Sequence, residues 1–573
     1  MLATNVRARA APAASRDDAN RRAATRIGAR RRAEPARASA RDDDAWPAEP
    51  PTGIVVMEKL LATVGDVGRI SKRAVSRRFG GADGAGRGAG EARRKRVVVL
   101  GSGWGAHALM KVADTDALDV TVVSPRNYFL FTPMLPSACV GTVEFRSLVE
   151  TVKVSNPLVS FLAAEVVSID QERKVLQCAA TTDPYGDPAA SGDSTLAFKD
   201  DVGGGMGRET FEVSYDTCVI AVGERPATFG VPGVRENCVF LKEIGDAAAL
   251  RRRIVQCFES ASIPGATDEE IAAALSFVVV GGGATGVEFA GTLADFVKSD
   301  LAARYPTVAG KAVVTLLQSQ STVLTQFSAG LQSAAISALE GAGVNVRLNV
   351  RVSEVKPSSA IIKTVEGTVE EIPFGMCVWS AGLSSRPLTE RLVKDGGDAQ
   401  ARHQRPTGSR KLAVDPWLRV VGSTDLLAIG DCSMLFGAPL PATAQVAAQE
   451  GAYVARLLNA AAFVGEGGVF SRPPTAAPIP WLTTLFKTPN LGSPIPPFHF
   501  LSLGLLAYVG DDRALTQFEL GKSNRLRYEA SGRFAFLLWK SVYVTKQVSF
   551  RNRVLILFDW LKTRVFGRDT SIF

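Results

Sequence analysis

Long apolar runs are missing from this sequence of 573 residues. No apolar run reaches about 18 residues, and the segment 498–510 is short and has His499 as its second residue, so a membrane-spanning helix is not expected. The seven cysteines are well separated and form no C-x-x-C pair, which argues against a disulfide framework, a zinc ribbon and a thioredoxin-like redox pair. The three histidines have no metal-ligand spacing, so no metal site is expected.

A basic folded surface is also lacking, although the net charge is +9. Residues 1–96 hold 22 Lys and Arg against 11 Asp and Glu, so they carry +11 and the rest of the chain carries −2. Because nucleic-acid binding needs a basic face on a fold, no nucleic-acid partner is expected. The share of apolar residues, 46%, is typical of a globular chain, and the length allows about two to four domains.

The basic residues belong to an N-terminal extension, residues 1–93, which we expect to lie outside the fold. Residues 1–50 are rich in Ala and Arg, as transit peptides are, although they include acidic residues. From Met57, the run MEKLLATVGDVGRISKRAVSRRFGG has apolar residues near helical spacing and then arginines, which favours an amphipathic targeting helix. A plain disordered extension is the alternative, and Met57 is a candidate start residue.

The run KRVVVLGSGWGA at 95–106 predicts a strand, a tight turn and the start of a helix. Gly101, Gly103 and Ala106 let the backbone approach a pyrophosphate, whose charge the helix N-terminus stabilises. The next strand ends at Ser124, where such units usually have an acid for a ribose. The run therefore predicts a dinucleotide site without that carboxylate.

The run SFVVVGGGATGVEFAG at 276–291 repeats this plan with Gly281, Gly283 and Gly286, about 180 residues further on. Two such turns in the same context are a stronger signal than one. The following strand ends on Gln318, again without an acid. Glu288, on the helix, is a candidate nucleotide contact, and a structural role in the helix is the alternative.

The run STDLLAIGDCSML at 423–435 predicts a further strand that ends at Gly430 and Asp431. A carboxylate at such a strand end binds a ribityl or ribose hydroxyl, and the alternative is that Asp431 caps the next helix. The order of the two turns and this returning segment predicts an α/β fold with tandem Rossmann-type units, one inserted in the other. This is the plan of a flavoprotein with two dinucleotide-binding domains.

Several runs together carry a resemblance to one family: SPRNYFLFTPMLPS at 124–137, LGSGWGA, GGGATGVE, YDTCVIAVG, FLKEI, TAQVAAQE and the ending FDWLKTRVFGRD. The sequence resembles type II NAD(P)H:quinone oxidoreductases, also called alternative or rotenone-insensitive NADH dehydrogenases, from about residue 95 to the C-terminus, apart from 180–210. The resemblance implies a non-covalent FAD, NADH or NADPH as the second nucleotide, and a membrane quinone. With the resemblance, the candidate residues are Gly101, Gly103, Ala106, Ser124, Arg126, Thr132, Pro133, Gly430 and Asp431 toward FAD, Gly281, Gly283, Gly286 and Gln318, with Glu288 from its place on the helix, toward the nicotinamide nucleotide, and Ala444, Gln445, Ala448 and Gln449 toward the quinone.

The implied function is an FAD-dependent oxidoreductase that passes a hydride from NADH or NADPH to FAD and two electrons on to the quinone, without proton pumping. The flavin carries the chemistry, so no catalytic side chain is named. A flavin-binding redox sensor or scaffold, and an enzyme similar to sulfide:quinone reductase, are the alternatives. Since a carboxylate at Gln318 would repel a 2′-phosphate and an amide does not, we expect NADPH to be accepted.

The run RNRVLILFDWLKTRVF at 551–566 places apolar residues on one face with basic residues beside them. This is typical of a helix that lies in a membrane interface, and packing on the protein's own core or on a dimer partner is the alternative. With the resemblance, it leads us to expect a C-terminal amphipathic helical membrane-binding segment, a homodimer, and a peripheral place on the mitochondrial inner membrane, with the chloroplast as the alternative. The expected domains are the extension 1–93, an FAD-binding domain at 94–245 and 391–500 with a flexible insertion at 180–210, an NAD(P)H-binding domain at 246–390, and a membrane-associating region at 501–573.

Overall fold

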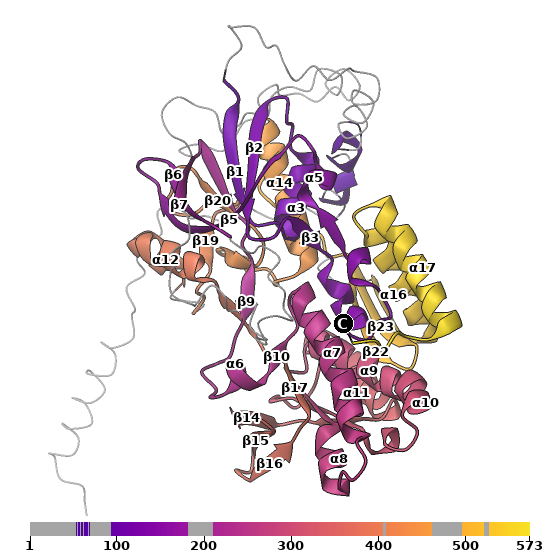
Figure 1. The fold of residues 1–573 in the computed structure, drawn as a ribbon. Helices are drawn as coiled ribbons and strands as arrows, with labels where there is room; N and C mark the ends of the chain where they lie inside the picture. Colours follow the sequence, from indigo (N-terminus) through magenta and orange to yellow (C-terminus); the bar gives the residue numbers. More distant parts are fainter. Residues whose placement is uncertain are drawn as a thin grey trace, which may run out of the picture. The chain divides into compact units, whose positions relative to one another are not determined.

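The computed structural model describes residues 93–181, 210–404, 408–460, 496–520 and 526–572, together with some residues between 53 and 68. The expected transit peptide at 1–50 and nearly all of the expected insertion at 180–210 lie outside the described residues. The described part contains two α/β units and a C-terminal region of strands and helices (Figure 1).

The first unit is built on a seven-stranded sheet with the strand order β20-β8-β1-β2-β5-β6-β7. Its strands are β1 (Lys95–Leu100), β2 (Leu118–Ser124), β5 (Ser160–Asp170), β6 (Val175–Ala180), β7 (Thr210–Ser214), β8 (Thr217–Ile220) and β20 (Leu426–Ala428). The five strands from β20 to β5 are parallel, and β6 and β7 extend the edge antiparallel. Strands β1 and β8 are almost wholly buried, as expected for parallel strands with both faces covered.

Helices α3 (Trp104–Val112) and α14 (Ala444–Asn459) of the first unit lie side by side. Glycines allow them to approach each other closely. A Cβ atom on Gly451 would lie 2.0 Å from the carbonyl oxygen of Gly105. The remaining elements of this unit are β3 (Tyr128–Leu130), β4 (Val149–Thr151), β9 (Glu224–Pro226), β18 (Leu383–Ser385), β19 (Leu412–Val414), β21 (Ser433–Leu435), α4 (Leu135–Cys139), α5 (Val152–Ser155), α12 (Pro387–Asp395) and α13 (Gly397–Gln404).

The second unit is built on a five-stranded parallel sheet with the order β10-β17-β11-β12-β13. Its strands are β10 (Val239–Phe240), β11 (Ser276–Val280), β12 (Val313–Leu317), β13 (Val344–Arg347) and β17 (Met376–Trp379). Its helices are α6 (Val234–Asn237), α7 (Ile244–Ala261), α8 (Asp268–Ala274), α9 (Ala284–Phe296), α10 (Ala302–Arg304) and α11 (Ala329–Gly341), and its antiparallel sheet is β14 (Val350–Val355), β15 (Ser359–Thr364) and β16 (Val369–Pro373).

The chain passes through the second sheet between two visits to the first. Strand β8 is followed by the second sheet, and β20 then returns to pair with β8. One Rossmann-type unit is therefore inserted in the other, as the sequence predicts. The predicted boundary at residue 245 stays a prediction, although β10 already pairs within the second sheet.

The C-terminal region begins with strands that the sequence did not predict. Strands β22 (Leu505–Gly510), β23 (Arg513–Leu520) and β24 (Leu526–Gly532) form an antiparallel sheet, followed by α16 (Arg533–Lys546) and α17 (Phe550–Phe566). Strand β22 packs against α9 of the second unit and also contacts α16, so this sheet connects the two terminal helices to the second unit (Figure 1).

Helix α17 turns Asn552, Ile556 and Asp559 toward the protein, while most of its large apolar side chains are exposed. Asn552 and Asp559 are buried, and their side chains bond to the Val149 carbonyl oxygen and the Ser147 hydroxyl, at 3.1 and 2.7 Å. The large apolar side chains on the helix that are exposed are Phe550, Val554, Leu557, Phe558, Leu561, Val565 and Phe566. Of the described helices, none is long and apolar enough to cross a membrane.

Part of the N-terminal segment contacts the folded protein. The described residues between 53 and 68 are helical, and Val55 and Asp66 are buried. The Asp66 carboxylate lies 2.6 Å from the guanidinium of Arg456 on α14, and Lys59 lies over the ring of Phe498. These contacts are with residues far along the chain, which helical spacing within the segment does not reveal.

Candidate active site

A cavity of about 1070 Å³ is lined by residues that follow strands of both sheets. Its position outside the carboxyl ends of parallel strands is where α/β sheets bind their ligands. The predicted site residues that line it are Gly101, Gly103, Ser124, Arg126, Thr132, Gly283, Gly430, Asp431 and Ala444. The predicted residues that do not line it are Ala106, Pro133, Gly281, Gly286, Glu288, Gln318, Gln445, Ala448 and Gln449.

The positions of the first glycine turn require small residues for different reasons. Gly101 has a φ of +106°, and a Cβ there would lie 2.5 Å from the carbonyl oxygen of Ala221. A Cβ on Gly103 would meet only the guanidinium of Arg126, at 4.0 Å, so this position is open to a ligand. Ala106 is fully buried on α3 and does not line the cavity, where its small side chain suits close helix packing.

Ser124 lies where such units usually have a ribose-binding acid, and its hydroxyl is already hydrogen-bonded within the protein. It is buried, and its hydroxyl donates to the Ser102 hydroxyl at 3.2 Å. The Arg126 Nε atom donates to the same Ser102 oxygen at 3.3 Å, and the Arg126 guanidinium pairs with Glu243. The expected FAD-side edge is thus formed by two serines and a charge pair.

Asp431 is directed to the cavity, and it does not cap helix α14. The N-cap of α14 is Thr443, whose hydroxyl accepts from the Val446 amide, so the capping alternative is wrong. Asp431 lies 3.8 Å from Lys242. The neighbouring Gly430 amide donates to the Glu450 carboxylate at 2.6 Å, and burial raises the pKa of Glu450 to about 8.

Thr132 lies beside an indole at the cavity wall. The Nε1 atom of Trp104 donates to the Thr132 hydroxyl at 3.1 Å, and both residues line the cavity. The Trp104 ring is packed edge-on against Phe129. Pro133 lies in the same short 3-10 turn as Thr132, outside the cavity lining. A polar contact and aromatic rings therefore fix this wall.

The second glycine turn has the same division of roles. Gly281 has a φ of +112°, and a Cβ on Gly286 would lie 2.0 Å from the Gly281 carbonyl oxygen. A Cβ on Gly283 would meet no protein atom within 4 Å, and Gly283 lines the cavity with Ala284 and Thr285. Gly286 and Gly281 therefore hold the shape of the turn, while Gly283 leaves room for a ligand.

Gln318 bonds to the turn instead of lining the cavity. Its Oε1 atom accepts from the amides of Gly282 and Ser319, both at 3.2 Å, and its Nε2 atom donates to the Thr322 carbonyl oxygen at 3.0 Å. A carboxylate could replace the acceptor but not the donor. One N–H of the Gln318 amide remains beyond the Thr322 bond, because the amide has two.

Glu288 is not among the described residues that line the cavity, and its contacts favour the structural alternative. It lies on α9, is buried, and accepts from the backbone amide of Tyr508 on β22 at 3.1 Å. Burial raises the pKa of Glu288 to about 8, although the Tyr508 bond lowers it. Sequence position on the helix does not reveal that this face meets the C-terminal sheet.

The stability of the protein should depend on pH through Glu288. Its folded-state pKa is about 8, above the ordinary unfolded value of about 4.3, so protonated Glu288 contributes stability that is lost as pH rises through about 8. The Glu288→Gln variant lacks this titration and keeps the acceptor for Tyr508. Thermal unfolding from pH 5 to 9 should show wild type losing stability relative to the variant; parallel curves would contradict the assignment.

The two glutamines predicted for the quinone pocket form hydrogen bonds with a neighbouring segment, residues 501–504. Gln445 exchanges hydrogen bonds with the backbone of Leu503 and Gly504, at 3.0 and 2.9 Å. Gln449 does the same twice with the backbone of Leu501, at 2.8 and 3.1 Å. Their amides position residues 501–504 beside α14, Ala444 lines the cavity, and Ala448 lies half-buried between them.

The cysteines do not contribute to the described lining of the cavity. All seven are buried, and none is among the described residues that line the cavity. The Sγ atoms of Cys238 and Cys377 lie 3.4 Å apart, in the core of the second unit. Nothing in the described part of the chain therefore places a cysteine pair beside the expected flavin.

The cavity is also lined by charged residues to which the sequence patterns assign no role. They are Glu165, Glu224, Lys242, Glu243, Arg386 and Arg391. Glu224 is buried, and its carboxylate lies 3.1 Å from Lys411. One local signal was present in the sequence: Glu243 and Asp246 have the spacing of a capping box, which helix α7 uses.

Comparisons with known proteins agree with this geometry. The family model of pyridine nucleotide-disulphide oxidoreductases matches residues 95–451, and that of the NDH2 C-terminal domain matches 503–569. A Schizosaccharomyces pombe protein, named as a probable mitochondrial NADH-ubiquinone oxidoreductase, is 35% identical over 83% of this chain and 83% of its own length. An internal alternative NAD(P)H-ubiquinone oxidoreductase of Solanum tuberosum mitochondria is 36% identical over 83% of this chain and 88% of its own.

The fold also matches a solved structure, that of NDH2 from Plasmodium falciparum in complex with NADH. The TM-score is 0.69 at 23% identity, and the match covers 84% of this chain and 100% of the other. At this identity the likeness concerns the fold alone. It extends over both nucleotide units.

Proposed function

Because the chain belongs to the family of alternative NAD(P)H-ubiquinone oxidoreductases, we propose that it is an FAD-dependent enzyme that oxidises NADH or NADPH and reduces a membrane quinone, without proton pumping. The observation that carries the proposal is the cavity between two glycine turns, one from each Rossmann-type unit. Such an arrangement serves an enzyme that holds two nucleotides against each other.

The residues of the first unit fit FAD. Gly103 leaves the phosphate turn open, the N-terminus of α3 faces it, and Arg126 adds a positive charge above it. Asp431 offers a carboxylate for ribityl hydroxyls, and Thr132 and Trp104 border the same space. When bound, FAD supplies the two-electron chemistry between the nicotinamide and the quinone, while the protein orients the partners and excludes water.

The second turn would hold the nicotinamide nucleotide. Gly283, Ala284 and Thr285 line the cavity at the N-terminus of α9, where backbone amides and the helix dipole favour a pyrophosphate. We propose the first unit as the FAD-binding domain and the second as the NAD(P)H-binding domain. The predicted bounds are 94–245 and 391–500 for the first and 246–390 for the second, although β10 already pairs within the second sheet and β18 pairs with β9 of the first unit. The quinone would approach beside Ala444, along residues 501–504, which Gln445 and Gln449 hold.

Absorbance of the flavin tests this function directly. Purified protein should lose its flavin absorbance when NADH or NADPH is added without oxygen, and should regain it when a short-chain quinone follows. Bleaching without re-oxidation by quinone would favour a redox sensor. A sulfide:quinone reductase would instead bleach with sulfide, and the absence of a cysteine from the described cavity lining disfavours it.

We expect the Gln318→Glu variant to shift preference from NADPH toward NADH. A carboxylate at the end of β12 accepts from a ribose 2′-hydroxyl and repels a 2′-phosphate. The variant also loses the bond to the Thr322 carbonyl oxygen, so Gln318→Met is the neutral control: it loses this bond, and also the acceptor for the Gly282 and Ser319 amides, without adding charge. Steady-state kcat/KM for both nucleotides provides the measurement, and an unchanged ratio would count against the assignment.

The exposed apolar face of α17, together with Phe534 and Leu537 of α16, is proposed to lie in the membrane interface. Because the face of α17 with Asn552, Ile556 and Asp559 is packed and bonded against the protein, the opposite, apolar face is exposed without help from a partner. Because a membrane quinone is dissolved in the bilayer, the proposed substrate favours the membrane as the partner of this face. A second copy of the chain, in a homodimer, is the alternative cover.

Charges on this face should weaken membrane binding. The variant Phe558→Glu/Leu561→Glu should lower partition onto anionic vesicles about tenfold or more, since each buried side chain contributes about 1.5–3 kcal/mol. Oxidation of NADH with a water-soluble quinone should be unchanged. Val365→Glu, at an exposed apolar residue of the second unit, is the control. If the double variant sediments with vesicles as well as wild type does, this role is contradicted. If the double variant changes from dimer to monomer, the face belongs to a contact with a second copy of the chain.

A mitochondrial location, peripheral on the inner membrane, is proposed from the relatives' names and the Arg-rich N-terminal residues. The chloroplast is the alternative. A fluorescent fusion at the C-terminus of the full chain, imaged with markers of both organelles, distinguishes them.

A further inference from the structure

Two neighbouring residues of opposite charge, Lys242 and Glu243, connect the second unit to the first across the cavity wall. Glu243 pairs with Arg126, and the Lys242 Nζ atom lies 3.8 Å from the Asp431 carboxylate. Arg126 follows β2 and Asp431 follows β20, while Lys242 and Glu243 follow β10. The two pairs therefore reach separate places at the carboxyl edge of the first sheet.

Asp246 fixes the backbone of this dipeptide. Its Oδ2 atom accepts from the amides of both Lys242 and Glu243, each at 2.8 Å. The Glu243 carboxylate in turn accepts from the amide of Asp246, which completes the capping box of α7. Asp246 is only 2% exposed, so the dipeptide is anchored to a rigid, buried point.

The charge pair of Glu243 holds a cation over the phosphate turn. The Arg126 guanidinium donates to Ser102 within the turn, at 3.3 Å, and lies 4.0 Å from where a Gly103 Cβ would be. Without Glu243, that guanidinium would keep only the Ser102 bond and a distant contact with the ring of Tyr128.

Lys242 is differently placed. Its distance of 3.8 Å from Asp431 is too long for a hydrogen bond, so its ammonium is near the expected ribityl site with donors to spare. Arg386 and Arg391 also line the cavity, but they donate to the carbonyl oxygens of Val222 and Val167. Lys242 thus places a cation at the cavity wall, beside Asp431.

We propose that the Lys242–Glu243 dipeptide is an electrostatic clamp on the bound flavin nucleotide. Glu243 keeps Arg126 over the phosphate turn, Lys242 raises the reduction potential of the flavin, and Asp246 is the positioning residue for both. A nearby cation favours the reduced flavin because reduction adds negative charge to the ring system. The inference rests on the proposed use of FAD.

The midpoint potential of the bound flavin, measured by equilibration with a reference dye, tests the role of Lys242. Lys242→Met should lower the reduced-to-oxidised ratio at a given potential about tenfold, which corresponds to about 30 mV for a two-electron couple. Lys242→Arg should keep the potential near that of wild type. A purely structural lysine would change stability without moving the potential, and an unmoved potential in Lys242→Met overturns the proposal.

Release of FAD tests the role of Glu243. Glu243→Gln and Arg126→Met should each speed FAD dissociation, and the double variant should be no faster than the worse single one, because both remove the same pair. Effects that add independently would overturn the pairing. Asp246→Ala should reproduce both the lower potential and the faster release, whereas Asp246→Asn, which keeps an acceptor oxygen, should be near wild type.

A matched control removes a capping box elsewhere. Thr267 and Glu270 cap α8 in the second unit, so Thr267→Ala should change neither the potential nor FAD release. If Asp246→Ala behaves like Thr267→Ala, the positioning role is overturned. Wild-type protein that binds no FAD would refute the proposed function itself, and is therefore distinguishable from a failure of the clamp alone.

Discussion

The Gly286→Ala variant is expected to lose about 100-fold or more in kcat/KM for NAD(P)H, while the FAD content stays close to that of wild type. The added Cβ would lie 2.0 Å from the Gly281 carbonyl oxygen and 2.6 Å from the Ser380 hydroxyl. Neither the turn nor the helix can accept this contact in place, so the backbone that would hold the pyrophosphate must move. A displacement of about 1 Å is enough for a loss of this size.

Gly283→Ala is the matched control for this prediction. Its Cβ would meet no protein atom within 4 Å, so thermal unfolding should equal that of wild type. Because Gly283 lines the cavity, the methyl group should raise the KM for the nucleotide instead. Stopped-flow bleaching of the flavin by NADH and by NADPH separates the two effects. A Gly286→Ala enzyme with wild-type kinetics would contradict the proposed role of the second turn.

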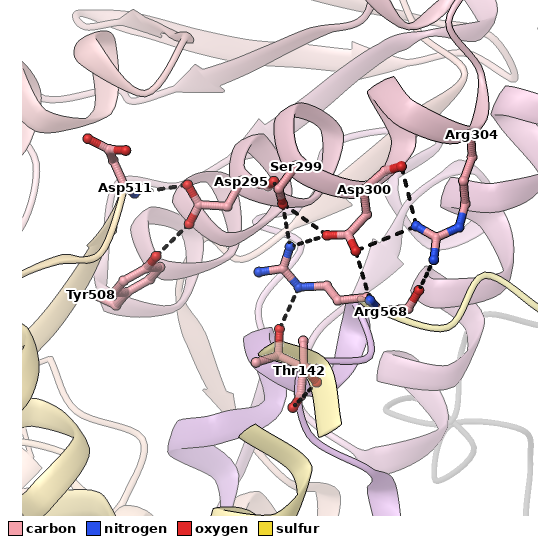
Figure 2. A network of polar contacts seen from close by, with 9 residues as sticks. Thr142, Asp295, Ser299, Asp300, Arg304, Tyr508, Asp511 and Arg568 are labelled. Carbon is pink, nitrogen blue, oxygen red and sulfur yellow. Dashed lines mark hydrogen bonds and ion pairs between the residues drawn. The ribbon is translucent and has the colours of Figure 1, made fainter. Parts of the chain in front are cut away.

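The Arg568→Met variant is expected to lower the free energy of unfolding by about 3 kcal/mol, because it leaves a buried carboxylate short of its main partner. The Arg568 guanidinium lies 2.7 Å from the Asp300 carboxylate and 2.9 Å from the Thr142 hydroxyl, and the Arg568 amide donates to the same carboxylate (Figure 2). Asp300 belongs to a π-helical turn after α9, whereas Thr142 belongs to the first unit. In the variant, Asp300 keeps the bond from the backbone amide of residue 568, the 3.5 Å contact with Arg304 and a bond from Ser299, but loses the guanidinium.

The same network predicts how this loss depends on pH. Burial alone would raise the pKa of Asp300, but the hydrogen bond from the Arg568 amide and the charge of its guanidinium lower that pKa below its usual value. A lowered folded-state pKa contributes stability above the unfolded value of about 3.9, and this contribution is lost as pH falls through the folded-state value. The difference between wild type and Arg568→Met should therefore shrink below about pH 4.

Arg513→Met is the control for the Arg568 variant. Its ion pair with Asp511 is 3.7 Å long and largely exposed, so the change in unfolding free energy should stay below about 1 kcal/mol. Denaturant unfolding of both variants, with hydrogen exchange of the α17 amides, provides the measurement. Equal stabilities of the two variants would show that the C-terminal residues do not hold the two units together.

Both glycine turns could be predicted from the sequence because their signals are local. A strand, a glycine turn and a helix are adjacent in the chain, so spacing alone placed Gly101, Gly103, Gly281, Gly283 and Gly286 in the turns, while their contacts with nucleotides stay a prediction. Residues that act through tertiary contacts could not be placed in this way. Glu288 lies on α9, the helix that follows the second glycine turn, which favours a nucleotide contact. The face of α9 that carries Glu288, however, meets β22 instead of the cavity.

The C-terminal region was predicted in part for the same reason. The apolar residues of α17 repeat at helical spacing, so the helix was evident from the sequence, whereas strands β22 to β24 were not expected. The face of α17 that meets the protein carries Asn552 and Asp559, which bond to residues about 400 positions earlier, and Ile556, which is buried in the core. Amphipathic spacing shows that a helix has two faces, and contacts decide which one is covered.

The sequence by itself determined the two Rossmann-type units, their nesting and the neutral Gln318 in place of an acid, because each depends on residues close together in the chain. Only the tertiary structure decided that Asp431 faces the cavity, that Gln445 and Gln449 hold residues 501–504, and that Glu243 meets Arg126. Side chains that meet across separate units owe their partners to the packing of whole sheets and helices, and no local spacing encodes that packing.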